Sequence, residues 1–203
     1  ALPDGSQLTL NANTEMDIIY YRDKRVIKLK RGEAIFEVSK DADRPFVVDS
    51  GIAKVTVLGT RFAVNQIDGR VIVAVDHGRV QVETKISSGN AEMTPVILSD
   101  GQMAEVSPNT SPVFLERNAM DAFGFSSGKL VFENASLNEV AETLSRYRLK
   151  PIIAIGKNSK QPHITAVMNV AETESFLKTL PQIAAVEVKQ NQNQTLLISK
   201  KIS

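Results

Sequence analysis

The stretch from residue 44 to residue 65, RPFVVDSGIAKVTVLGTRFAVN, constrains the fold more than any other part of the chain. It contains three short runs in which apolar and polar residues alternate, separated by Ser50-Gly51 and by Gly59. A two-residue period rich in β-branched side chains predicts strands with one buried face. A glycine between two such runs predicts a bulge or a sharp corner. The stretch therefore predicts the core of an all-β unit, and it displays no catalytic residue type.

Similar short runs continue to about Val113, and residue pairs ending in glycine stand beside them. The runs are 7–10, 26–29, 34–38, 46–48, 54–58, 62–64, 71–75, 80–82, 96–98 and 103–106. The pairs form a loose repeat, which would suit coils stacked as in a solenoid, although a residue followed by glycine is also the usual hairpin signal. The pairs are Asp4-Gly5, Arg31-Gly32, His77-Gly78 and Asp100-Gly101. We expect an all-β domain over 1–113, a solenoid-like or jelly-roll-like stack of short antiparallel strands.

The pattern changes after the loop signal PNTSP at residues 108–112. We interpret residues 114–127 as a connector whose Phe123 and Phe125 rings anchor it to one domain or both. Beyond Gly128 a helical stripe follows a capping-box signal, Ser136 with Glu139. The elements expected there are strands 130–132, 152–155, 164–170, 186–188 and 196–198, a helix after Ser136, and a helix over 173–180 that Pro181 ends or kinks. This order predicts a small α+β domain over 128–203, built from two βαβ-type units.

Composition and charge exclude several classes of function. The formal net charge is +1, so no strong field attracts a nucleic acid or an anionic surface. Cysteine is absent, which excludes disulfides and thiolate metal sites. The longest apolar runs fall far short of the ~20 residues of a membrane helix. Because the chain starts without methionine, we expect a fragment whose targeting segment has been removed.

No arrangement of residues predicts catalysis, a cofactor or a metal. His77 and His163 are the only imidazoles, and a zinc site needs three or four ligands. Five loop serines lack a nucleophile elbow: Ser50, Ser87, Ser88, Ser126 and Ser127. The carboxylate pairs Asp41/Asp43 and Glu172/Glu174 fit loop and helix-cap positions. The basic stretch over residues 22–31 alternates with apolar residues, so its lysines fit the solvent face of a strand. We therefore expect a protein that is not an enzyme.

Five blocks of the chain resemble the FecR family, the sigma factor regulators of bacterial cell-surface signalling. They are LPDGSQLTLN at 2–11, RGEAIFEV at 31–38, RPFVV at 44–48, VLGTRFAV at 57–64 and HGRVQV at 77–82. The segment GKLVFENASLNEVA at 128–141 resembles the C-terminal domain of the same family, which is similar to the STN domain of secretins and TonB-dependent receptors. The family usually has a tryptophan just before this last segment, where Phe123 and Phe125 stand here.

The resemblance implies a role for the intact protein. A cytoplasmic segment absent from this chain would bind an extracytoplasmic-function sigma factor, and a single inner-membrane helix would precede residue 1. The chain itself would lie in the periplasm and bind the N-terminal signalling domain of a TonB-dependent siderophore receptor, with regulated proteolysis passing on the iron-uptake signal. The alternative is an envelope or secretion-apparatus module that binds a glycan or a copy of itself, because STN-like domains also occur in secretins.

Partner binding would use strand edges of the second domain, where main-chain hydrogen bonds give affinity and alternate side chains give specificity. The candidate residues are Ile164, Ala166 and Met168 on one strand, Leu196 and Ile198 on another, and the flanking Thr165 and Asn169. The alternative is that half of the apolar candidates face the helices of their own domain.

Overall fold

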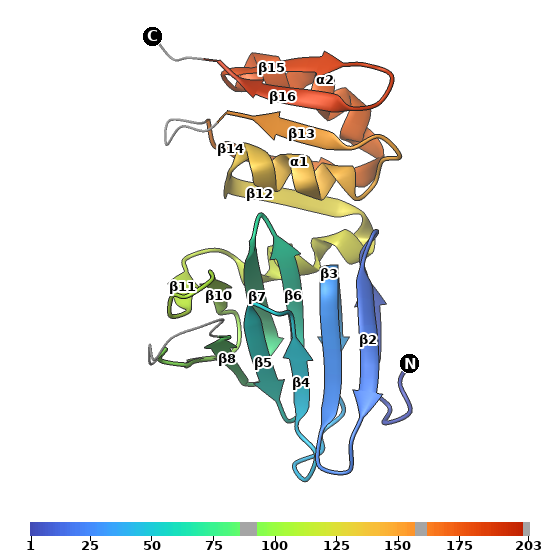
Figure 1. Ribbon diagram of the computed structural model, residues 1–203, viewed down its shortest axis with the longest axis vertical. Helices are drawn as coiled ribbons and strands as arrows, with labels where there is room; N and C mark the ends of the chain where they lie inside the picture. The colour runs from blue at the N-terminus through green and yellow to red at the C-terminus, as the bar shows by residue number, and fades with distance from the viewer. Residues whose placement is uncertain (86–92, 157–161, 201–203) are drawn as a thin grey trace. The chain divides into compact units, whose positions relative to one another are not determined.

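The computed structural model describes residues 1–85, 93–156 and 162–200 (Figure 1). The chain divides into two compact units, residues 1–123 and 124–203. No helix within the described ranges is long and apolar enough to cross a membrane. Ser87 and Ser88, two of the serines considered above, lie outside the described residues.

The first unit is a strand-rich structure built on one large curled sheet (Figure 1). The strand order is β11-β10-β7-β6-β3-β4-β5-β8-β9, and β1 and β2 also pair with β3. The strands are β1 (Gln7–Leu10), β2 (Glu15–Tyr20), β3 (Arg25–Glu37), β4 (Phe46–Asp49), β5 (Ala53–Val57), β6 (Arg61–Ile67), β7 (Arg70–His77), β8 (Val80–Thr84), β9 (Val96–Leu98), β10 (Met103–Val106) and β11 (Val113–Leu115).

Strand β3 belongs to both halves of the curled sheet. Its first half pairs with β2 and β4, and its second half pairs with β1 and β6. The change occurs at Gly32, where φ is +92° and a Cβ would lie 2.5 Å from Thr14 Oγ1. Across the curl the inner faces meet, because the Phe36 ring centroid lies 6.0 Å from that of Phe46 on β4. Within its own half, Phe36 also stacks on Phe62 of the adjacent strand β6, with the centroids 5.0 Å apart. The core of the unit therefore lies between two halves that share one strand.

Three further glycines mark the corners where the chain passes between these halves. Gly59 lies between β5 and β6, Gly78 between β7 and β8, and Gly101 between β9 and β10, and none of these successive strands pair with each other. The hairpin interpretation is therefore wrong for Gly78 and Gly101, and Gly32 lies inside a strand. The expectation of antiparallel pairing holds in this unit except for β3 and β4, which are parallel.

The three strands expected between residues 44 and 65 are confirmed as β4, β5 and β6. The corner at Gly59 is also confirmed, because a Cβ there would lie 2.8 Å from the Cα of Lys40. The sequence did not indicate β2 or β11. In β2, EMDIIY lacks strict alternation and borders solvent, while β11 spans only three residues. The runs at 26–29 and 34–38 are one continuous strand, β3.

The second unit has two sheets and two α-helices. β12 (Lys129–Ala135) pairs with β14 (Ile164–Asn169), and β13 (Ile152–Ile155), β16 (Thr195–Ser199) and β15 (Val186–Gln190) form the order β13-β16-β15. The helices are α1 (Leu137–Ser145) and α2 (Thr173–Ile183), with a 3-10 turn, η2 (Val170–Glu172), before α2. Leu137, Val140 and Leu144 of α1 and Leu177 and Leu180 of α2 are fully buried in one core cluster with strand residues.

The ends of the two helices follow from particular residues. Ser136 Oγ accepts a hydrogen bond of 3.0 Å from the Glu139 amide, which confirms that half of the capping box. The expectation that Pro181 ends or kinks α2 is wrong as to the end, because α2 continues to Ile183. A proline in the last turn removes only one helical hydrogen bond, and Leu180 beside it is fully buried.

The two connector rings lie in η1 (Ala119–Ser127), a 3-10 helix. Phe123 is buried, and the Arg61 guanidinium lies 4.8 Å from its ring centroid. Phe125 packs against the core cluster of the second unit. The two rings therefore anchor the connector, as expected, one in each unit.

Candidate partner-binding surface

The candidate residues on β14 alternate between core and solvent. Ile164 and Met168 are buried and Ala166 packs against the same core, whereas Thr165, Val167 and Asn169 are exposed. The side chains of β14 that face solvent are therefore not those of the candidates Ile164, Ala166 and Met168, which face the core. In the run ITAVMNV the set 164, 166, 168 and 170 is wholly apolar, whereas Thr165 and Asn169 make the other set mostly polar. The alternation is therefore that of a strand whose Ile164 face is buried, which argues against those apolar residues as partner contacts.

The two flanking candidates take part in local hydrogen bonds. Thr165 Oγ1 accepts a hydrogen bond of 3.1 Å from the Asn134 amide at a bulge in β12. The Asn169 side chain accepts from the Ala171 amide at 2.9 Å, and the Glu172 carboxylate accepts from the Asn169 amide. Glu172 therefore serves as a helix cap, as the sequence indicated.

The candidates on β16 lie in a strand that is paired on both sides, because β13 and β15 flank it. The edge of β16 is thus closed to an added strand. Leu196 and Ile198 are half-buried side chains on the face away from the fully buried Leu197. A partner could reach the outward side chains of Leu196 and Ile198, but it could not pair with the main chain of β16.

Four apolar side chains form an outer apolar face on the three-stranded sheet. The register pairs Ile153 with Leu196 and Ile155 with Ile198, and the two isoleucines of β13 are 42% and 45% exposed. Ile152 and Ala154 point to the core instead. Strands β13 and β16 run parallel, and parallel sheets are normally covered on both faces. Here helices cover one face, and the face formed by Ile153, Ile155, Leu196 and Ile198 stays accessible.

A partly open strand edge and a charged rim border this face. Within the described residues, β13 pairs with no strand other than β16, but on its other edge the Ser145 hydroxyl bonds both the amide and the carbonyl oxygen of Ile152. An added strand could therefore pair with this edge only from Ala154 onward. On the opposite side the register continues to β15, where Lys189 lies beside Leu196 and Glu187 beside Ile198. These two charges form an exposed ion pair of 3.3 Å. An apolar centre with a polar rim is the usual anatomy of a protein-binding surface.

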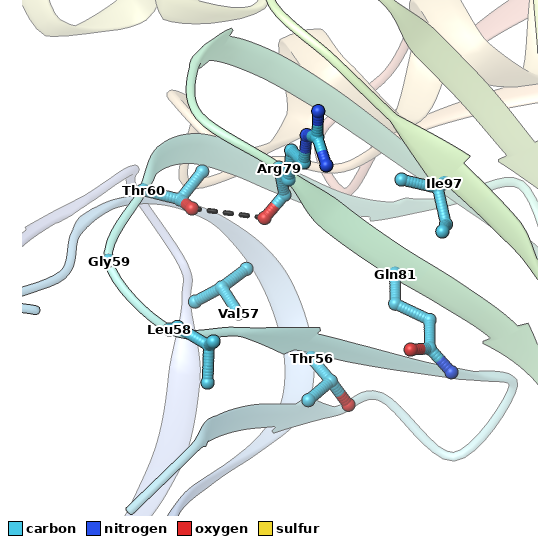
Figure 2. Close-up of a pocket in the computed structure, with 8 residues that line it drawn as sticks. All are labelled: Thr56, Val57, Leu58, Gly59, Thr60, Arg79, Gln81 and Ile97. Carbon is cyan, nitrogen blue, oxygen red and sulfur yellow. Dashed lines mark hydrogen bonds between the residues drawn. The ribbon is translucent and has the colours of Figure 1, made fainter. Parts of the chain in front are cut away.

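A shallow hollow of about 340 Å³ lies on the first unit (Figure 2). Eight residues line it: Thr56, Val57, Leu58, Gly59, Thr60, Arg79, Gln81 and Ile97. Residues 57–60 belong to the VLGTRFAV block that carries the family resemblance. The Thr60 hydroxyl donates a hydrogen bond of 3.0 Å to the Arg79 carbonyl oxygen, which holds the corner at Gly59 against the start of β8.

A buried ion pair fixes the first residues of the chain. Arg25 Nη1 lies 2.6 Å from Asp4 Oδ2, and the two side chains are 1% and 5% exposed. Arg25 also donates to the Ser39 and Arg44 carbonyl oxygens, and its guanidinium lies 5.4 Å from the Phe46 ring centroid. Burial raises the pKa of Asp4, but hydrogen bonds from Arg25 and Ser6 outweigh it and lower the pKa to about 2.

The remaining ionisable residues considered in the sequence are either exposed to solvent or held in ion pairs. His77 and His163 are exposed, and Asp41 pairs with Arg44 at 2.8 Å. Glu174 lies 2.6 Å from Arg148 Nε. Among the residues that the structure describes, no group of three or more His, Cys, Asp or Glu side chains could hold a metal ion.

Sequence reasoning missed Ile153 and Ile155, the most exposed residues of the outer apolar face. The run PIIAI was recognised as a strand, but a short all-apolar run does not show which side chains are covered. It also counted Arg25 within a basic surface stretch, although that side chain is buried. An aspartate at position 4 gives no sequence signal for a partner so far along the chain.

Comparisons with known proteins agree with the fold just described. Residues 1–81 match the family model FecR, described as the FecR protein. Two crystal structures of a "putative anti-sigma factor" from Parabacteroides distasonis, at 1.65 and 2.50 Å resolution, give TM-scores of 0.83 and 0.82. Each is 23% identical over 98% of this chain and 93% or 92% of the other, a likeness that shows a shared fold. No curated protein matches the chain.

The family match and the sequence blocks fall on the same strands. The matched range, residues 1–81, includes β1 to β7, the glycine corners at Gly32 and Gly59, and the Asp4–Arg25 ion pair. Residues 1–81 are thus similar to the FecR family, and the solved structures show that the fold is shared over nearly the whole chain.

Proposed function

We propose that this chain is the periplasmic signalling part of a FecR-type, membrane-anchored regulator, and that it binds the N-terminal signalling domain of a TonB-dependent siderophore receptor. On this proposal the chain relays the iron-uptake signal to an extracytoplasmic-function sigma factor and catalyses no reaction. The observation that carries the proposal is the outer apolar face of the second unit, beside the partly open edge of β13, in a chain whose residues 1–81 match the FecR family model.

The outer apolar face would supply the affinity. Covering the side chains of Ile153 and Ile155 removes apolar surface from water, at roughly 25 cal/mol for each Å². A strand of the receptor domain added to β13 would pair with the main-chain groups of that edge beyond Ile152, whose own groups are bonded to the Ser145 hydroxyl. Leu196 and Ile198 would contact the partner through their outward faces, one strand further in.

The other predicted residues would act from a second surface of the same unit. Thr165 and Asn169 lie with Val167 on the solvent side of β14, and Val167 is 65% exposed. Ile164, Ala166 and Met168 would support that strand from the core. On this proposal, β14 adds specificity and the three-stranded sheet supplies most of the affinity.

Titration calorimetry with a purified receptor signalling domain tests the proposal directly. We expect heat of binding and one-to-one stoichiometry. No heat and no comigration in the high micromolar range would contradict it. The alternative function, an envelope or secretion-apparatus assembly module, predicts instead that light scattering grows with the concentration of the chain alone, because the apolar face would then meet a second copy.

A further inference from the structure

The hollow on the first unit has a chemical character that the proposed function does not use. Strand alternation places Thr56, Gln81 and Ile97 in one row across β5, β8 and β9, because Thr56 pairs with Gln81 and Gln81 with Ile97. Their neighbours Val55, Val57, Val80 and Val82 are buried on the inner face. The row therefore lies on the outer face of the sheet, and Figure 2 shows these side chains around the hollow.

A second row completes the hollow with an apolar side chain and a cation. Extending the β5–β8 register past Val57 places Leu58 opposite Arg79. Leu58 and Ile97 are large apolar side chains that are 47% and 63% exposed. The hollow thus has an apolar side chain in each row, with hydroxyl, amide and guanidinium groups between them.

Arg79 gives the lining of the hollow a positive charge. Among the residues that the structure describes, the Arg79 side chain forms no ion pair, and no aspartate or glutamate lines the hollow. Glu83, on the outer face of β8, lies 2.9 Å from Lys54 Nζ and also accepts a hydrogen bond of 2.6 Å from the Gln81 side chain. Asp41, whose amide bonds to the Leu58 carbonyl oxygen, pairs with Arg44, and Asp100 accepts a hydrogen bond from the Gly78 amide. Lys40, packed against Gly59, is a further cation without an ion pair in the described ranges.

We propose that this hollow binds an extended peptide segment that carries an acidic side chain next to an apolar one. The carboxylate would pair with the Arg79 guanidinium, which can donate two parallel hydrogen bonds to a planar carboxylate. The apolar side chain would cover Leu58 or Ile97. Strand β9, which pairs only with β8 among the described strands, offers main-chain groups beside Ile97. This surface lies on the first unit and does not depend on the receptor contact proposed for the second.

Nuclear magnetic resonance titration of the 15N-labelled chain tests the proposal with two probe peptides. One is acetyl-Asp-Leu-Asp-Val-Asp-Leu-amide, and the other has lysine in place of each aspartate. We expect the acidic peptide to shift the amide signals of residues 56–60, 79–81 and 96–98, with affinity that falls as salt is raised. We expect the basic peptide to leave them unchanged.

Variants then separate charge from apolar contact. Arg79→Glu should weaken binding of the acidic peptide by about tenfold or more, a loss of ~1.4 kcal/mol, and favour the basic peptide. Arg22→Glu makes the same change at another exposed site of the first unit and should leave the affinity unchanged. Ile97→Ser should weaken binding several-fold, whereas Val113→Ser, also on an exposed edge strand, should not. If Arg79→Glu does not fold, Arg79→Gln takes its place, with the salt dependence of the native chain as the second measurement.

Three outcomes would overturn the proposal. The first is equal affinity of the native chain and the Arg79 variant for the acidic peptide. The second is a set of shifted signals that lies away from the hollow. The third is the absence of any shift at several millimolar peptide, since a contact weaker than about 4 kcal/mol of binding free energy carries no recognition.

Discussion

The two units treat the solvent-facing sides of their sheets differently. In the first unit, ion pairs lie along the outer faces and edges of the strands: Lys30 with Glu15 and Asp17, Lys54 with Glu83, Lys85 with Asp49, and Arg61 with Asp76. In the second unit, the outer face of the three-stranded sheet carries two exposed and two half-buried apolar side chains beside the Lys189–Glu187 ion pair. Guarded strands resist association, whereas an apolar face invites it. The difference supports the proposal that the receptor domain docks on the second unit, while the first unit acts as the scaffold for that contact and carries only the smaller hollow around Leu58 and Ile97.

The largest effect is expected from removing one member of the buried ion pair in the first unit. Asp4→Ala leaves the Arg25 guanidinium charged and buried, which should lower the free energy of unfolding by about 3–5 kcal/mol. Urea unfolding followed by circular dichroism measures the loss. Asp41→Ala breaks an exposed pair with Arg44 and should cost less than about 1 kcal/mol. Equal losses in the two variants would show that burial of the ion pair has no special role.

A valine at Gly59 tests whether the first unit is a scaffold. Gly59→Val brings side-chain atoms against the Lys40 backbone, and we expect a loss of about 3 kcal/mol in unfolding free energy. Affinity of the folded protein for a receptor domain should stay unchanged. Leu58→Val, at the neighbouring exposed position, is the control and should be nearly neutral. A well-folded Gly59→Val protein without receptor affinity would contradict the division of roles.

Acid should destabilise the first unit before the second. The pKa of Asp4 is about 2 when folded and near 3.8 when unfolded, so its contribution is present above pH 4 and is lost as the pH falls towards 2. The shift corresponds to about 2 kcal/mol. Thermal unfolding at pH 4 and at pH 2 measures this change. The same comparison for Asp4→Asn should show a smaller difference between the two pH values, and an identical difference would rule out Asp4 as its source.

Charges on the outer apolar face should abolish docking without unfolding the second unit. Ile155→Asp combined with Leu196→Asp should weaken receptor binding by at least tenfold, because each carboxylate would lose water at the interface. Both side chains are partly accessible, so the melting temperature should change little. Val113→Asp makes a similar change at an exposed position of the first unit. If calorimetry gives the double variant and Val113→Asp the same affinity for the receptor domain, the outer apolar face is not the docking surface.

The smallest effect concerns the guarding ion pairs themselves. Lys54→Ala removes an exposed pair with Glu83 and should change the unfolding free energy by less than about 0.5 kcal/mol. Its expected consequence is a greater tendency to associate, because β5 loses a charge from its outer face. Light scattering over a range of concentrations measures this tendency, and Lys178→Ala, on α2 of the second unit, is the control.

Strands in which apolar and polar residues alternate strictly could be predicted from the sequence together with their buried face. Where both alternations are apolar, the strand could be predicted but its buried face could not. In β5 the polar Lys54 and Thr56 separate three buried residues, so both strand and buried face could be predicted. In β13 both alternations are apolar, and only the helices packed on one side decide which is buried. The glycine corners were visible as breaks, but whether a break leads to a hairpin or to the other half of the sheet depends on distant pairing partners.

The sharing of β3 between the two halves of the first unit has a consequence for how this unit opens. A sandwich of two separate sheets could lose one sheet edge while the other stays intact. Here the strand that pairs with β2 and β4 continues into the strand that pairs with β1 and β6. Pulling β3 out of either half breaks hydrogen bonds in both. The unit should therefore open as one cooperative block, and amide hydrogens of β4 and β6, on opposite halves, should exchange with the same free energy of opening.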